Sequence, residues 1–328
     1  MFFGEILSLF VALSWTATAL FAEVASKRIG SLPLNIARMV MSLLLLGATL
    51  WLTMGSPYPR FADRATWQWL LLSGIVGYVI GDFCLMQGYI HIGSRFGQLF
   101  MTLSAPTAAI FGRILIGEQM RPLAIIGMVV TLGGIALSIL SKNSTSHKDF
   151  PKVKLNLPLR GIAYAAMAGI CQGCGLVLSK VGLQHYETAL STSGLTAQSV
   201  PAEALLPLPL AISLPFAATM IRAVMGLAGF MLMQMLLSKE RFGELQRAAT
   251  DRKAMLCALG STLFGPFIGV SLSLMATLYT SAGIAQTIFA LTPVLIIAPA
   301  ALLFHQRVTP REVIGAVISV AGVTLFFI

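Results

Sequence analysis

The chain has 328 residues, of which 57% are apolar and only 10% are charged, and its formal net charge is +10. Soluble domains are about 45–50% apolar and about 25% charged, so these values and a mean hydropathy of +0.86 exclude an ordinary soluble protein and indicate one that folds in lipid. The basic excess forms no polar basic module, which excludes a nucleic-acid-binding protein.

Ten apolar runs follow one another along the chain, each long enough for the roughly 20 residues that a helix needs to cross a bilayer. They fall at residues 3–25, 32–54, 66–88, 93–117, 121–141, 159–182, 212–238, 254–278, 281–304 and 310–328. The runs are unbroken, unlike the alternating short strands of a membrane β-barrel. We therefore predict an all-α polytopic membrane protein with ten transmembrane helices.

Little of the chain lies outside these runs. A polar linker covers residues 142–158, a connection with Ser, Thr and Pro covers 184–211, and a charged loop covers 239–253. The start of the chain has no positive n-region and no evident cleavage site, so the first run is expected to be a retained span. Three Lys and Arg residues are assigned to the face that holds the N-terminus and fifteen to the opposite face, which the positive-inside rule makes cytoplasmic.

The two halves of the chain repeat each other. At an offset of 188 residues, identical residues coincide at Gly77 and Gly265, Gly81 and Gly269, Gln98 and Gln286, Leu103 and Leu291, Pro122 and Pro310, Gly127 and Gly315, and Gly134 and Gly322. Arg38 aligns with Arg222 at a shorter offset. Because five spans is an odd number, the second copy enters the membrane from the other side, which predicts inverted repeats at residues 1–141 and 159–328. Such halves can open a central site to each side in turn; a duplicated, non-transporting scaffold is the alternative.

Short motifs occur in order through both halves: Trp15, Arg38, Leu103-Ser104-Ala105-Pro106, Gly117-Glu118, Gly127 and Gly134, then Leu291-Thr292-Pro293, Arg307, Pro310, Gly315 and Gly322. At these positions the chain resembles the EamA-type transporters of the drug/metabolite transporter superfamily, over almost its whole length. The resemblance implies a ten-helix carrier of small metabolites in the inner membrane, often an exporter, with a central cavity. It also implies cytoplasmic termini, which is opposite to the charge count.

The chain departs from that family pattern in three places. His305-Gln306 stands where the family usually has Gly-Glu, Glu23 stands where a Lys is often found, and the connection 184–211 is long. The resemblance therefore implies a class of transporter and not a particular solute. Amino-acid-like and drug-like solutes both suit the polar residues of the spans.

Polar and aromatic side chains within the spans are the candidates for binding a solute: Trp15, Tyr78, Asp82, Gln98, Thr102, Gln172 and Gln286. Amides orient polar solutes, and aromatic faces bind apolar bodies or cations. Hydrogen bonding between helices is the alternative role of the glutamines. Pro106, Pro266 and Pro293 free backbone carbonyls within their helices and are expected to be kinks or hinges.

Ionisable side chains within the spans are the candidates for gates or coupling, because each costs about 2.5–3.5 kcal/mol to insert. Asp82 is expected to bind a proton or a substrate ammonium group, or to pair with Arg38 or Arg95. One charged cluster is predicted at each membrane face, and the two are expected to form and break in turn. Their members are Glu23, Arg38, Asp82 and Arg95 at one face, and Lys180, Arg222, Arg113 and Glu118 at the other. Snorkelling to the interface is the alternative for Arg113 and Lys180.

An intramembrane lipid-modifying enzyme is the competing class of function. The chain has no Asp-Asp-x-x-Asp, His-Glu-x-x-His or Gly-x-Ser-x-Gly motif, so no metal-dependent or serine chemistry is indicated. It also has no phosphate-binding loop, which leaves proton coupling or facilitated diffusion. We expect no cofactor, no metal and no disulfide, a small solute and the bilayer as partners, and a monomer or homodimer.

Overall fold

The computed structural model describes residues 2–140, 158–196, 198–200, 205–206, 209–238, 240, 242–296, 299 and 310–325, and every regular element among them is helical. Seven helical stretches are long and apolar enough to cross a membrane, and three shorter apolar helices accompany them. The predicted all-α polytopic membrane protein is confirmed, whereas the count of ten crossings stays a prediction. Residues 142–157, His305, Gln306, Arg307 and the side chain of Arg95 lie outside the described part.

The helices are α1 (Phe3–Ile29), α2 (Ser31–Met54), α3 (Arg64–Gly74), η1 (Ile75–Asp82), α4 (Phe83–Met101), α5 (Ser104–Ile116), α6 (Pro122–Leu140), α7 (Leu159–Thr192), α8 (Leu210–Leu237), α9 (Phe242–Thr250), α10 (Arg252–Thr262), η3 (Leu263–Phe267), α11 (Ile268–Tyr279), α12 (Ala282–Phe289), α13 (Thr292–Leu295) and α15 (Pro310–Thr324). The two η elements are π-helical.

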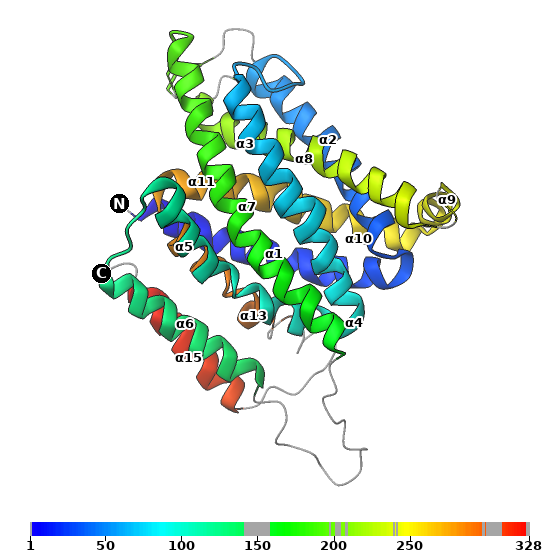
Figure 1. Ribbon diagram of the computed structural model, residues 1–328, viewed down its shortest axis with the longest axis vertical. Helices are drawn as coiled ribbons and strands as arrows, with labels where there is room; N and C mark the ends of the chain where they lie inside the picture. The colour runs from blue at the N-terminus through cyan, green and yellow to red at the C-terminus, as the bar shows by residue number, and fades with distance from the viewer. Residues whose placement is uncertain are drawn as a thin grey trace.

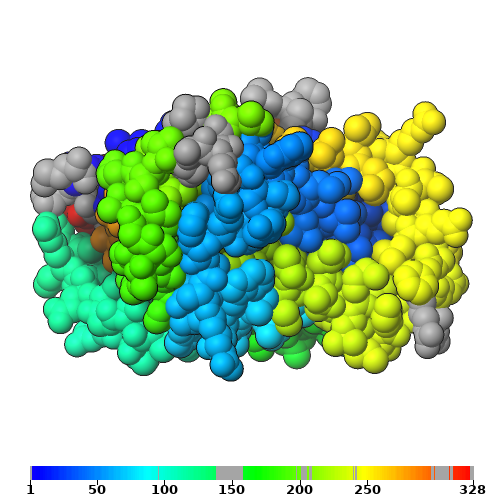
Figure 2. Space-filling view, turned by 90° about the horizontal axis from the view of Figure 1, so that it is seen from above, coloured from blue at the N-terminus to red at the C-terminus, as the bar shows by residue number. Residues whose placement is uncertain are grey.

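Helices from both halves of the chain pack against each other throughout the bundle (Figure 1). α1 packs against α10 and α11, α7 packs against α3 and α4, and α2 packs against α8. Figure 2 shows α3 and the helix that follows it between α7 and α8 on one face of the molecule. Large apolar side chains on the outside, such as Leu44, Ile114 and Leu236, are more than two-thirds exposed, as expected of a surface that faces lipid.

The pair α6 and α15 forms one edge of the bundle and is held together by small residues (Figure 1). A Cβ atom added to Gly134 would lie 2.6 Å from the backbone nitrogen of Ser319, and one added to Gly322 would lie 2.6 Å from that of Thr131. The hydroxyl of Thr131 also donates to the carbonyl of Ser319. Residue numbers increase along α6 where they decrease along α15, so the two helices are antiparallel. The absence of a side chain at the glycines allows the two backbones to come into contact.

The helices α3 and α10 begin in the same way, with an aspartate as N-cap. Asp63 accepts a hydrogen bond from the backbone N–H of Thr66 at 2.8 Å, and Asp251 accepts one from that of Ala254 at 3.0 Å. These bonds satisfy amide groups that have no partner within the helix. They also hold the pKa of Asp63 and of Asp251 below the ordinary value, because they favour the charged carboxylate.

The three predicted kink prolines all lie at irregular points of the helices. Pro266 lies inside the π-helix η3, and η1 is π-helical around Gly77 and Gly81. Pro106 and Pro293 each lie in the first turn of a helix, after a break between α4 and α5 and between α12 and α13. A proline costs little in a first turn because its missing N–H would have no partner there.

Two connections differ from the sequence-based boundaries. α7 continues to Thr192, so the connection expected from residue 184 begins as helix. The two apolar runs expected at 66–88 and 93–117 are joined through α4, and the joint lies at Gly93, whose φ of 79° and ψ of 163° are not helical. That backbone region is essentially open to glycine alone.

We expect Gly93→Ala to lower the free energy of unfolding by about 1–3 kcal/mol, through backbone strain alone. The nearest atom to an added Cβ, Oε1 of Glu23, lies 3.6 Å away, so there is no clash. Gly133→Ala is the matched control, because Gly133 is exposed within α6 and has nothing within 4 Å of an added Cβ. Thermal unfolding in detergent should separate the two variants, and equal melting temperatures would contradict the strain.

Candidate functional site

A small central cavity of about 50 Å³ lies among helices of both halves, below the roughly 300–1,000 Å³ typical of small-molecule pockets. Its walls come from α1, α2, η1, α4, α7, η3 and α11. The lining residues are Trp15, Thr18, Arg38, Tyr78, Asp82, Leu85, Met86, Tyr89, Gln98, Met101, Gln172, Gly265, Pro266 and Val270. Five of the seven residues predicted to bind a solute are therefore on one cavity: Trp15, Tyr78, Asp82, Gln98 and Gln172.

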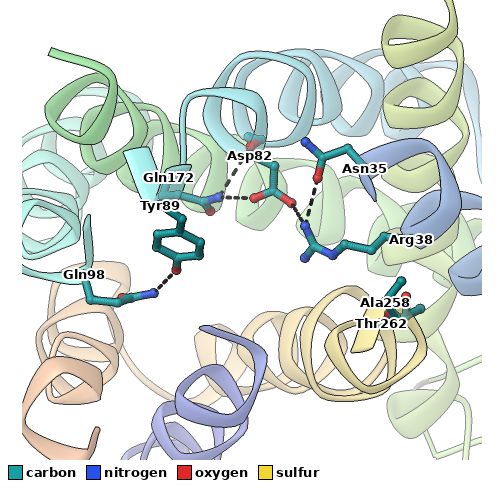
Figure 3. A network of polar contacts seen from close by, with 9 residues as sticks. Asn35, Arg38, Asp82, Tyr89, Gln98, Gln172, Ala258 and Thr262 are labelled. Atoms are coloured by element: carbon teal, nitrogen blue, oxygen red, sulfur yellow. Dashed lines mark hydrogen bonds and ion pairs between the residues drawn. The ribbon is translucent and has the colours of Figure 1, made fainter. Parts of the chain in front are cut away.

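A buried ion pair crosses one wall of this cavity (Figure 3). Nη1 of Arg38 donates to Oδ2 of Asp82 at 3.2 Å and to Oδ1 of Asn35 at 3.0 Å. The amide of Gln172 donates to the other oxygen of Asp82 at 3.0 Å. Both carboxylate oxygens thus accept hydrogen bonds. These bonds offset the free-energy cost of removing the Asp82 carboxylate from water.

A second buried arginine lies beside the pair without bonding to it. The guanidinium of Arg222 stands 4.9 Å from the centre of the Tyr78 ring, in a cation–π contact. Its side chain fills the space left by Gly77, because an added Cβ there would be 2.9 Å from Nη2. Arg222 was expected in the cluster at the N-terminal face; the structure instead places it in the interior, near Asp82 and Tyr78.

A tyrosine and an amide on α4 also line the cavity. Nε2 of Gln98 donates to the hydroxyl of Tyr89 at 2.5 Å (Figure 3). Trp15 packs edge-on against Phe289, with ring centres 4.9 Å apart. These groups give the cavity aromatic surface with polar atoms at its border.

Two predicted solute-binding residues do not line this cavity. Thr102 lies at the break between α4 and α5, where its hydroxyl donates to the carbonyl of Leu99 at 2.7 Å. Gln286 is buried between helices, where it accepts from Ser104 at 3.2 Å and donates to the carbonyl of Gln172 at 3.4 Å. This position corresponds to the alternative role in which a glutamine joins helices.

A carboxylate fastens helices together at the face where α1 ends. Glu23 accepts hydrogen bonds from both the backbone N–H and the hydroxyl of Ser94. Its other oxygen pairs with Lys27 at 2.5 Å. Glu23 thus lies apart from the buried pair of Arg38 and Asp82, with which one common cluster was expected. We call Glu23, Lys27 and Ser94 the distal clasp.

A similar arrangement occurs at the face where α1 begins. Lys180 pairs with Glu118 at 2.5 Å and donates to the carbonyl of Thr280 at 2.9 Å. The other oxygen of Glu118 accepts from the backbone N–H of Ala282 at 3.0 Å. We call Glu118, Lys180 and Ala282 the proximal clasp. Arg113 is exposed and outside it.

Helical periodicity could have identified several residues of the site that the sequence analysis missed. Leu85, Met86 and Tyr89 follow Asp82 at spacings of three, four and seven residues, which places all four on one helix face. Asn35 precedes Arg38 by three residues, a spacing at which side chains meet. Helical spacing from the predicted residues Asp82 and Arg38 would therefore have identified these four additional residues. The described residues contain no group of three or more His, Cys, Asp or Glu that would hold a metal ion.

The sequence profile of the EamA-like transporter family matches residues 2–140 and 208–328, which is most of the chain. The chain belongs to this family. It is therefore a multi-pass membrane transporter of the drug/metabolite transporter superfamily, as the motifs indicated, and a small solute and the bilayer are its partners. A comparison with curated proteins gives no match.

A solved crystal structure shares the fold of this EamA-like chain. It has a TM-score of 0.67 at 15% sequence identity, and the match covers 98% of this chain and 96% of the other. At that identity the likeness concerns the arrangement of helices and carries no information on the solute.

We expect Asp82→Asn and Arg38→Gln each to destabilise the transporter by about 3–5 kcal/mol, because each leaves a buried charge without its partner. The double variant should lose less than the sum of the two, because no carboxylate and no Arg38 charge remain. Equilibrium unfolding in mixed detergent micelles measures all three. Arg28→Gln is the control, since its partner Asp251 is at the surface, and it should change little. Strictly additive losses would contradict a coupled pair.

Proposed function

We propose that this protein is a secondary carrier that moves a small metabolite through the central cavity by alternating access, as an exporter in the cell inner membrane. The observation that carries the proposal is the buried ion pair of Arg38 and Asp82 on the wall of a cavity between the two halves. Charged groups at that depth are costly and are kept where a protein uses them. Protons are the candidate coupling ion, with facilitated diffusion as the alternative.

Alternating access rests on the proposal that residues 1–141 and 159–328 are inverted repeats, joined by the linker 142–158. Support comes from predicted mates that meet in space. Arg38 pairs with Asp82 and Arg222 interacts with the same carboxylate electrostatically, and α6 and α15 pack antiparallel through Gly134 and Gly322. Mates that meet head to tail are what a two-fold axis in the membrane plane produces.

The two clasps act as gates in this proposal. Each joins a glutamate to the first backbone amides of a helix, Ser94 in one half and Ala282 in the other, and these residues are 188 apart. Each carboxylate also holds a lysine. Opening one clasp while the other stays closed would admit solute from one face only. The kinks near Pro106 and Pro293 are where the adjoining helices would bend.

The clasps predict a side-specific response that cysteine labelling can measure. The reporter is Val270→Cys, which lines the cavity, in a background in which Cys84, Cys171, Cys174 and Cys257 are replaced by alanine. Glu118→Gln should raise labelling by a membrane-impermeant maleimide added at the face where α1 begins, severalfold over the parent. Glu23→Gln should do so at the other face.

The control is Glu240→Gln, because Glu240 pairs with Arg247 at the surface and neither residue belongs to a clasp. It should leave labelling from both faces unchanged. If either clasp variant increased labelling equally from both faces, the clasps would not be alternating gates.

Export is tested by metabolite profiling of cells with and without the gene, in cytosol and in medium. We expect at least one solute to accumulate in the cytosol of the deletion strain and to fall in its medium. The intact gene should reverse the change, and the Asp82→Asn variant, expressed at the same membrane level, should not. A solute that instead falls in the cytosol of the deletion strain would indicate import.

A further inference from the structure

We propose that the cavity takes a small organic anion, a monocarboxylate with an apolar body, as its solute; this inference rests on the proposed carrier function. The first observation is a count of charge. Arg38, Asp82 and Arg222 are each at most 5% exposed, and together they leave one positive charge. Glu5, the remaining buried charged residue of the described part, bonds to Thr280 at the face where α1 begins.

An uncompensated positive charge in a lipid-embedded interior is costly. A solute carboxylate would bring the group to two arginines and two carboxylates, and so to neutrality. A cationic solute would raise the charge to two positive units. It would also need Asp82, both of whose oxygens are already taken by Arg38 and Gln172.

The second observation is a surplus of hydrogen-bond donors. Four buried side-chain atoms around the ion pair have no partner among the described residues: Nε of Arg38, Nε of Arg222, Nδ2 of Asn35 and the hydroxyl of Tyr78. Three are nitrogens that only donate, and the fourth can donate. Of these four residues, Arg38 and Tyr78 line the cavity, so their two donors are the ones that a solute would meet. A carboxylate has acceptor lone pairs for both.

The remaining wall determines the body of the solute. Leu85, Met86, Pro266 and Val270 are apolar, and Trp15 and Tyr89 present aromatic surface. Arg38 is the cation that lines the cavity, so the charged end of the solute would lie toward α2 and its apolar end toward α4 and α1. Burial of that body supplies affinity that an inorganic anion would lack.

The test uses four probes with one carbon skeleton: 3-phenylpropionate, 3-phenylpropionamide, 3-phenylpropylamine and phenylalanine. Each is titrated into the purified full-length protein, and affinity is read from the rise in melting temperature. We expect the carboxylate to bind at least tenfold more tightly than the other three. Equal or tighter binding of the amine or of phenylalanine, or no rise with any probe, would overturn the proposal.

Variants separate the charge from the shape of the cavity. Arg38→Gln should abolish the preference for the carboxylate over the amide, whereas Arg38→Lys should keep most of it. If Arg38→Gln does not fold, Arg38→Gln combined with Asp82→Asn removes both partners and should also lose the preference. Arg28→Gln, at the surface, should bind as the parent does. A preference that survives the removal of Arg38 in either background would contradict the assignment.

Uptake of labelled 3-phenylpropionate into proteoliposomes distinguishes this inference from the proposed function. Binding without uptake of this probe would support the anion site and count against carriage. Uptake of the amine in preference to the carboxylate would overturn the anion site and leave carriage standing.

Discussion

A buried arginine and aspartate that neutralise each other constrain how the helices in the interior of this membrane protein pack. Arg38 and Asp82 lie on α2 and at the end of η1, so their contact fixes where these two elements meet. Asn35 and Gln172 complete the hydrogen bonds that the pair needs, which also ties in α7. Because any one of these groups left alone would be a buried polar group without a partner, the four positions act together.

Most of the fold could be predicted from the sequence, because lipid imposes a simple rule on it. Every backbone group must be bonded within its own helix, so long apolar runs are spans. The rule says less about where a helix is irregular. Two examples are the π-helical turns around Gly77 and Pro266, and a third is the break at Gly93. They depend on the distance to a neighbouring helix, which residue spacing along the sequence does not predict.

The candidate site was predictable in its residue types and less so in its grouping. Charge within a span marked Arg38, Asp82 and Arg222, but sequence position along the spans assigned the arginines to opposite faces. In the structure Arg38 pairs with Asp82 and Arg222 interacts with it electrostatically, because the long arginine side chains extend into the interior. Glu23 shows the converse, since a local lysine and the start of a neighbouring helix hold it at the surface.

The proposed symmetry of the two halves does not extend to the place where charge is held. Val270 stands 188 residues after Asp82, and both line the cavity, so one half contributes a carboxylate where the other contributes a hydrocarbon. Two conformations that exchange the roles of the halves would therefore differ in energy when the carrier is empty. The unloaded protein would have a preferred resting form, the one in which Asp82 meets Arg38, and cargo would have to overcome that bias in each cycle.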